Sequence, residues 1–367
     1  MRKYIGFTWR RNIILVFLFT VAIVVNAQKP EQKPYQKPVL ASRDSWSMIM
    51  LPDPQGYVKF SRNQPIFEMM TAWVEENIDS LNIKVAVSTG DLVEQNDLMV
   101  PDGTNGNQNS PAQWKSVSNA FSRLDGKIPY VVSAGNHDYG YVNAGAIRKS
   151  NLNSYFPVNK NFKNLQVLRD VAPNAEGVPT LENAAYEIIS PKGRRFLILS
   201  LEFAPRDTIL GWAKKLISKP VYKDYTVVVL THSYLNSKNE RPEKENYNVV
   251  GNFGEAIWKK LVAPSTNIQL VLSGHICAPD DFRAHVGFRT DKNAGGKTVN
   301  QLAFNAQAMG GGWYGNGGDG WLRILEFLPD DKTVKVKTFS PFFAISPTTQ
   351  QFAWQHDSWN EFTFAFD

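Results

Sequence analysis

The chain has 367 residues, with 40 Lys and Arg against 34 Asp and Glu and a formal net charge of +6. Four of the basic residues and none of the acids lie in residues 1–27, so the remainder carries 36 against 34, or +2. Nucleic-acid binding needs basic residues gathered on one face, and this balance argues against it. The single cysteine excludes an internal disulfide, and about 340 residues can bury a core without one.

The N-terminus has the pattern of an export signal. Residues 2–11 hold four basic residues, residues 12–25 are apolar, and Val25 and Ala27 are small residues at the positions that a signal peptidase reads. The apolar run is about 14 residues, short for a hydrocarbon layer of roughly 30 Å. We therefore expect residues 1–27 to be removed as a signal peptide, which leaves an exported protein that is periplasmic, cell-surface or secreted. An uncleaved membrane anchor is the alternative.

Residues 28–45 are rich in Pro, Lys and Gln and predict an extended linker. Residues 46–367 are expected to form a single domain. Its irregular stretches 94–110, 139–183 and 234–250 are long for a compact domain and are expected to frame a site.

The first half of the domain alternates strand and helix patterns. Apolar runs at 47–51, 83–91 and 128–138 predict buried strands, and residues 65–81 and 111–126 have helical spacing. This βαβαβ order indicates parallel strands joined by helical crossovers.

The second half mixes both kinds of pairing. Residues 184–203 predict a hairpin, 206–219 and 254–263 helices, and 225–233 and 268–275 buried strands. The final strands, at 299–307, 320–330, 332–341 and 362–367, are expected to be antiparallel, with a tight turn at 329–332. The fold class predicted is α/β, a two-sheet β-sandwich flanked by helices.

Polar side chains follow five of the predicted strands. Because ligands bind beyond the carboxyl ends of strands in α/β sheets, we expect these groups along one edge. A turn residue, a helix cap or a buried histidine would explain each one alone, but the joint order favours a site. Carboxylate, amide and imidazole together suit Mn²⁺, Fe, Zn²⁺ or Mg²⁺. The residues are Asp53, Gln55, Asp91, Asn136, His137, Asp138, His232 and His275.

These ordered motifs resemble those of the calcineurin-like metallophosphoesterases, over roughly residues 48–341. The resemblance implies a four-layer α/β/β/α fold and two divalent metal ions (Mn, Fe, Zn, Mg or Ca). It implies that Asp91 bridges the metals, that Asp53 and Gln55 serve the first metal, and that Asn136, His232 and His275 serve the second.

Two positions depart from the family pattern, and both fall on the first metal. Gln55 stands where the first motif usually has His, and Cys277 stands where the last motif has its second His. Cys277 is either a thiolate ligand or an inward-facing cysteine, in which case Asp280, Asp281 and His285 are alternative donors. His356 and His285 otherwise fit surface or strand histidines.

Our hypothesis for the mechanism is hydrolysis of phosphate monoesters by in-line attack of a metal-bound hydroxide. His137 is expected to act on the substrate phosphate and protonate the leaving oxygen, with Asp138 setting its tautomer. Trp313 and Tyr314 in the glycine-rich stretch 310–321 are candidates for binding a sugar ring or base, unless this stretch only joins two strands.

Three functions therefore stay open at this stage. The first is a phosphomonoesterase acting on small-molecule or glycan phosphate esters. A phosphodiesterase or nucleotide hydrolase would use the same metals, and a non-catalytic glycan-binding protein would fit a decayed site.

Overall fold

The computed structural model describes residues 34–141 and 144–367. Its strands form two seven-stranded sheets, each of mixed direction. The first sheet has the order β13-β12-β11-β1-β2-β3, with β14 also paired to β12. Its strands are β1 (Trp46–Leu51), β2 (Ile83–Ser88), β3 (Tyr130–Val132), β11 (Leu322–Phe327), β12 (Thr333–Phe339), β13 (Trp354–Gln355) and β14 (Phe362–Ala365).

The second sheet has the order β4-β5-β6-β7-β8-β10-β9. Its strands are β4 (Leu168–Pro173), β5 (Pro179–Ile189), β6 (Arg195–Ser200), β7 (Thr226–Leu230), β8 (Ile268–Ser273), β9 (Val286–Lys292) and β10 (Thr298–Phe304). The run β1-β2-β3 is parallel in the first sheet, and β6-β7-β8-β10 is parallel in the second. Each sheet therefore presents several strand carboxyl ends at one edge.

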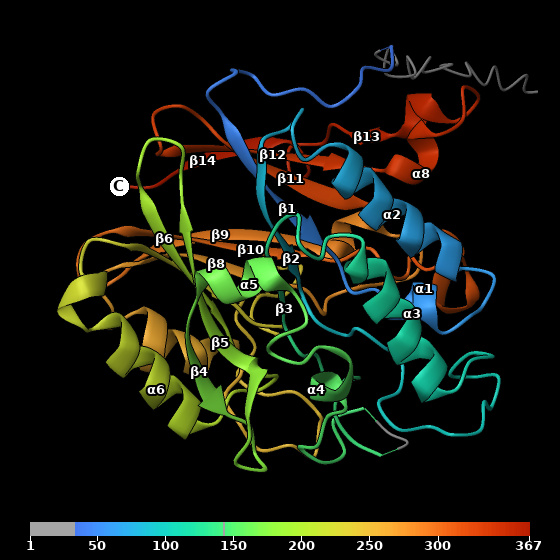
Figure 1. Cartoon of the computed structure of the whole chain (residues 1–367), viewed down its shortest axis with the longest axis horizontal. Coiled ribbons are helices and arrows are strands. Elements are labelled where there is room, and N and C mark those ends of the chain that lie inside the picture. Colours follow the sequence, from blue (N-terminus) through green and yellow to red (C-terminus); the bar gives the residue numbers. More distant parts are fainter. Residues whose placement is uncertain (1–33, 142–143) are drawn as a thin grey trace, which may run out of the picture. The chain divides into compact units, whose positions relative to one another are not determined.

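Helices cover the outer sides of the two sheets. Figure 1 shows α2 and α3 beside the first sheet and α6 beside the second, on opposite flanks of the molecule. The helices are α1 (Gln55–Val58), α2 (Gln64–Glu76), α3 (Ser110–Ser122), α4 (Leu152–Tyr155), α5 (Phe162–Val167), α6 (Asp207–Ile217), α7 (Gly254–Ile257) and α8 (Pro341–Ala344), and a π-helix (Trp258–Val262) extends α7.

The alternation of strand residues explains the layers. In β7, Val228 and Leu230 belong to the large core between the sheets, whereas Val227 and Val229 belong to a second core under α6 and the π-helix. A strand that is buried on both faces has a continuous apolar sequence, as β7 does with TVVVL. The predicted sandwich with flanking helices is confirmed.

The element boundaries differ from the sequence prediction in several places. The helix expected to reach residue 81 ends at Glu76, and the strand expected over 128–138 is only three residues long. The strand of residues 298–304 pairs parallel with β8, so the prediction that the late strands are all antiparallel was wrong. The stretch 139–183 contains α4, α5 and β4 in addition to irregular chain. The hairpin of 184–203 and the turn at 329–332 are confirmed.

Tyr35–Asp367 form one compact unit, which includes the second half of the predicted linker. That segment lies against the first sheet: Trp354 Nε1 donates to the carbonyl of Gln36 at 2.8 Å, and Lys337 Nζ donates to that of Val39 at 3.2 Å. The predicted signal peptide, residues 1–27, lies outside the described residues. Among the described residues, no helix is long and apolar enough to cross a membrane.

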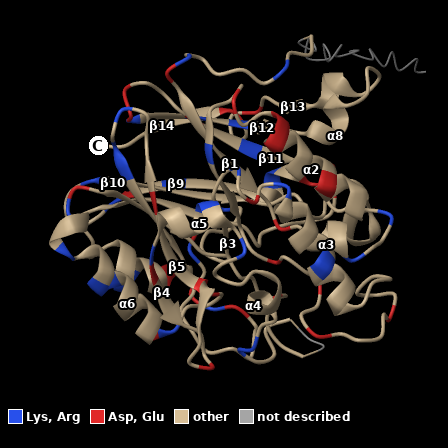
Figure 2. Cartoon of the chain, viewed as in Figure 1, with Lys and Arg blue, Asp and Glu red and all other residues tan. Residues whose placement is uncertain are grey.

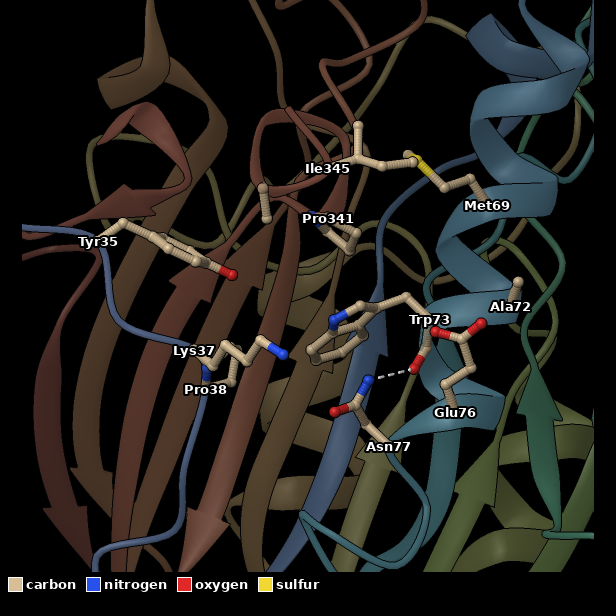
Figure 3. Close-up of a pocket in the computed structure, with 11 residues that line it drawn as sticks. Tyr35, Lys37, Pro38, Met69, Ala72, Trp73, Glu76, Asn77, Pro341 and Ile345 are labelled. Carbon is tan, nitrogen blue, oxygen red and sulfur yellow. Dashed lines mark hydrogen bonds between the residues drawn. The ribbon is translucent and has the colours of Figure 1, made fainter. Parts of the chain in front are cut away.

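A cavity of about 380 Å³ lies between this segment, α2 and α8. In Figure 3 the Trp73 ring stands in its middle, with Lys37 pointing toward the ring and the Asn77 amide bonded to the Trp73 carbonyl. The cavity is lined by Tyr35, Lys37, Pro38, Met69, Ala72, Trp73, Glu76, Asn77, Pro341, Ala344 and Ile345. None of these belongs to the predicted site, which forms at the strand ends instead.

Candidate metal centre and active site

Polar side chains from both sheets meet beyond the strand carboxyl ends. Asp53, Asp91 and Asn136 follow β1, β2 and β3, and His232 and His275 follow β7 and β8. They contact one another although they are far apart in sequence: the backbone N–H of His275, for example, donates to Asp53 Oδ2 at 2.9 Å across 222 positions. The two sheets together therefore build one polar cluster, as the strand-end pattern predicts.

His232 lies at the centre of this cluster. Its Nε2 atom is 2.9 Å from Asn136 Oδ1, 3.1 Å from Asp91 Oδ2 and 3.0 Å from His275 Nδ1. Its Nδ1 atom is 2.9 Å from the carbonyl of Thr89, which can only accept. In the neutral ring the proton therefore sits on Nδ1, and the Nε2 lone pair faces three other electron-rich atoms.

The electrostatics of this cluster favour a positive charge. Burial lowers the pKa of His232, but the charges of Asp91 and Asp53 outweigh it and raise the pKa to about 10. Burial opposes ionisation of Asp91, yet the charge of His232 holds the pKa of Asp91 below its usual range. Donor atoms of Asp91, His232 and His275 all lie within 4.8 Å of one another, so a divalent cation fits this donor set.

Two glycines make the close approach possible. A Cβ on Gly135 would lie 2.1 Å from Asp91 Oδ1, and one on Gly274 would lie 2.2 Å from Asp53 Oδ1. Asp91 (φ 49°) and His275 (φ 70°) also adopt the left-handed backbone conformation, which is uncommon outside glycine. The Gly-Asn-His-Asp and Gly-His motifs thus contain glycine where any side chain would displace a carboxylate.

The half of the cluster around Asp53 is arranged differently. Asp53 Oδ1 accepts from Thr89 Oγ1 at 2.6 Å, and Oδ2 accepts from Asn305 Nδ2 at 2.6 Å as well as from the backbone of His275. Burial, the largest effect on this carboxyl, raises its pKa to about 6. The Oε1 atom of Gln55 is buried and has no hydrogen-bond partner among the described residues, which suits an oxygen donor to a cation.

Cys277 is half-buried, and its Sγ atom accepts from Gln307 Nε2 at 3.1 Å. Burial raises the pKa of its thiol to about 12. The Oε1 atom of Gln307 is also buried without a partner in the described chain. The first-metal half therefore offers two unpaired amide oxygens beside a protonated thiol.

His137 is oriented by a backbone carbonyl. The ring Nδ1 atom of His137 lies 2.6 Å from the carbonyl oxygen of Glu94. The backbone N–H of His137 donates to Asp91 Oδ1 at 2.9 Å. Asp138 was expected to set the tautomer of His137, but its oxygens accept from the N–H groups of Val93 and Gly135, at 3.1 and 2.8 Å. Asp138 thus holds the loop that carries His137 rather than touching the ring.

Several residues of the cluster were missed by sequence reasoning. Glu245 Oε2 is 3.0 Å from His275 Nε2, Asn305 contacts Asp53, and Lys59 lies 3.3 Å from Glu94 in a buried ion pair. Asn305 follows β10, so the strand-end rule would have found it if that strand had been recognised as parallel. The only sequence signal for Glu245 was the length of the 234–250 segment.

The remaining predicted residues lie outside the cluster. Gly311 N–H donates to Asp280 Oδ1 at 3.0 Å, which ties the glycine-rich stretch to the segment after Cys277. Trp313 and Tyr314 in that stretch are exposed, by 45% and 59%, whereas Trp321 is buried. The ring of His285 is bonded to the Ala278 carbonyl at 2.7 Å, and His356 pairs with Glu361 on the surface. Asp281 caps its own turn by accepting from the N–H of Arg283.

A family model described as calcineurin-like phosphoesterase matches residues 60–279, more than half of the chain. The chain belongs to this family of metal-dependent phosphoesterases. It is 28% identical over 316 residues to the uncharacterized protein YvnB of Bacillus subtilis (strain 168), covering 84% of this chain and 21% of that protein. The chain thus spans about a fifth of this relative's length.

Among solved structures, GAP50, the anchor in the inner membrane complex of Plasmodium, matches with a TM-score of 0.39 and 12% identity. The match covers 81% of this chain and 85% of that one.

Proposed function

We propose that the protein hydrolyses phosphate monoesters, using two divalent cations held at the strand ends. The observation that carries this proposal is the convergence of Asn136 Oδ1, Asp91 Oδ2 and His275 Nδ1 on His232 Nε2, all at 2.9–3.1 Å. Such a buried set of electron-rich atoms needs a compensating positive charge.

The cations would be held by two overlapping groups of residues. Asp91, Asn136, His232 and His275 would hold one, and Asp53, Gln55 and Asp91 would hold the other. When bound, divalent cations would neutralise charge on the phosphate oxygens and bring the pKa of bound water close to neutral pH.

The protein's own groups then orient the ester and move a proton. The Glu94 carbonyl accepts the proton on His137 Nδ1, so Nε2 carries a proton only when the ring is an imidazolium. Burial lowers the pKa of His137, but the charges of Asp91 and Glu94 outweigh it and raise the pKa, so the charged ring can give its Nε2 proton to the leaving oxygen. If Asn136 binds a cation through its Oδ1 atom, its amide N–H groups can donate to a phosphate oxygen. Asp138 stabilises this arrangement by accepting hydrogen bonds from the backbone N–H groups of Gly135 and Val93.

For the substrate we propose a sugar or glycan phosphate. Trp313 and Tyr314 are exposed aromatic faces on a stretch that is bonded to the segment following the Gly-His motif, and such faces suit sugar rings. Basic and acidic residues are interspersed along the strands and loops in Figure 2, and neither kind gathers over one sheet. That distribution favours a small ester over a polyanion.

We also propose that the protein is exported, from the pattern of residues 1–27. The test is N-terminal sequencing of the protein recovered from outside the cytoplasm, where we expect Gln28 as the first residue. Recovery of the intact N-terminus in the membrane fraction would favour the anchor instead.

The enzymatic proposal is tested by comparing p-nitrophenyl phosphate with bis-p-nitrophenyl phosphate, before and after chelation and with Mn²⁺, Zn²⁺, Mg²⁺ or Ca²⁺ restored. We expect metal-dependent turnover that is faster on the monoester. Faster turnover of the diester would indicate a phosphodiesterase, and no turnover with any metal would indicate a binding protein.

A further inference from the structure

The side chain of Glu245 joins the metal centre from a loop rather than from a strand end. Its side chain is 13% exposed, and its buried Oε2 atom lies 3.0 Å from His275 Nε2 as an ion-pair contact, without a hydrogen bond to any described residue. Its Oε1 atom accepts from the hydroxyl of Ser233, which directly follows His232. One carboxylate therefore contacts His275 directly and the chain beside His232.

The position of Glu245 is maintained by contacts on both sides of it. The Tyr247 ring packs edge-on against Phe203 at 5.2 Å and against the His275 ring at 6.1 Å. The N–H of Val249 donates to the Gly145 carbonyl at 3.2 Å. On the other side, Arg241 pairs with Glu255 and Asp291, each at 2.8 Å. The carboxylate is thus held against His275 by the packing of the whole segment.

His232 and His275 direct opposite ring nitrogens into the cluster. His232 has the Thr89 carbonyl on Nδ1 and points Nε2 into the cluster, whereas His275 has Glu245 on Nε2 and points Nδ1 into the cluster. A neutral imidazole carries one N–H, so an acceptor on one nitrogen leaves the lone pair on the other.

We propose that Glu245 is a positioning residue that keeps the proton of His275 on Nε2 and so presents Nδ1 as a metal donor. This inference rests on the metal centre proposed above. A carboxylate behind a ligating histidine fixes the ring and increases its basicity, and losing such a partner typically lowers metal affinity about 10–100-fold.

The test is metal affinity, measured by titration calorimetry of the metal-free chain with Zn²⁺ and, separately, Mn²⁺. We expect Glu245→Ala to weaken the tighter site about 10–100-fold and Glu245→Gln, which keeps the shape and an acceptor oxygen, to weaken it less. Glu243→Gln is the matched control, because Glu243 is exposed on the same segment, and it should leave the affinity unchanged.

A double-mutant cycle shows whether Glu245 acts through His275. In a His275→Ala background, adding Glu245→Ala should change the affinity by less than about threefold. The full loss in that background, or no loss in Glu245→Ala alone, would overturn the proposal.

The tautomer provides a readout that a merely structural role would not move. Long-range ¹H–¹⁵N spectra of the metal-free chain at alkaline pH should show the His275 proton on Nε2, shifting toward Nδ1 in Glu245→Ala. A His275 proton on Nδ1 in the unmodified chain would contradict the inference. The metal titrations and the tautomer spectra do not use an ester. A chain that binds metal as expected but hydrolyses nothing would therefore refute the proposed function and leave this inference intact.

Discussion

The half of the cluster around His232 and the half around Asp53 both lie beyond strand carboxyl ends. They differ in how many of their potential metal-donor atoms already accept hydrogen bonds from the protein. Around His232, three atoms of Asn136, Asp91 and His275 lie 2.9–3.1 Å from Nε2, which has only a lone pair when the ring is neutral. Around Asp53, three protein N–H or O–H groups already occupy the carboxylate, and the unpaired atoms are amide oxygens of Gln55 and Gln307.

Because of this difference, we expect the two proposed cation positions to differ in affinity and in the metal that each prefers. Two imidazoles, a carboxylate and an amide suit Zn²⁺, Fe or Mn²⁺, whereas an oxygen-only set suits harder ions such as Mg²⁺ or Ca²⁺. We therefore expect the His232 half to bind its cation tightly and the Asp53 half to bind weakly.

The largest effect is expected at Asp91, which we propose as a ligand shared by both halves. Asp91→Asn keeps the shape but removes the charge that faces His232 at 3.1 Å. Metal content should fall at both positions and kcat/KM by about 10⁴-fold. Elemental analysis and steady-state assays check this, with the exposed Asp79→Asn as the control. Full metal occupancy in Asp91→Asn would rule out a shared ligand.

Removal of one half is the next largest change. In His232→Ala the centre of the nitrogen-rich half is lost, so we expect one cation equivalent fewer and a fall in kcat of about 10³-fold. Metal-binding stoichiometry by calorimetry measures the outcome. Loss of both equivalents together would mean that the halves are not separable.

His137 should affect the chemistry without affecting either half. Because its ring contacts Glu94 and only its backbone N–H contacts Asp91, His137→Ala should retain metal and lose about 10²–10³-fold in kcat. The loss should be smaller on p-nitrophenyl phosphate than on an alkyl phosphate, whose leaving group needs the proton more. Unaltered turnover of the alkyl ester would remove His137 from the mechanism.

The weak half can be strengthened. Gln55→His replaces a buried, unpartnered amide oxygen with the imidazole that is usual at this position of the family, and we expect Zn²⁺ affinity there to rise about tenfold. Competition titration against a chelator of known affinity reports the change. An unchanged affinity would show that Gln55 does not face the cation.

The smallest effect is expected at Cys277. Its thiol is held protonated by burial and accepts from Gln307, so Cys277→Ser should change metal content and kcat/KM by less than about twofold. Loss of one cation equivalent in this variant would instead identify the thiol as a ligand.

Much of the fold and of the cluster was predictable from local pattern. Apolar runs ending in Gly-Asp, Gly-Asn-His-Asp and Gly-His marked strand ends, and parallel pairing sends strand ends to one edge whatever lies between them. The errors arose where strand pairing depends on residues far apart in the sequence. The pattern of residues 298–304 fits a parallel or an antiparallel strand equally well, and only its pairing with β8 shows that it is parallel. Asn305 was missed for the same reason.

Without any structure, the sequence specifies which residue types stand at the strand ends and shows that Gln55 and Cys277 depart from the family pattern. Which atoms face one another could be identified only in the folded chain, because hydrogen-bond partners depend on contacts across hundreds of residues. It placed Thr89 behind His232, Glu245 behind His275 and the Glu94 carbonyl behind His137. These acceptors select the tautomer of each imidazole, and the selected tautomer determines which nitrogen can bind a cation or move a proton.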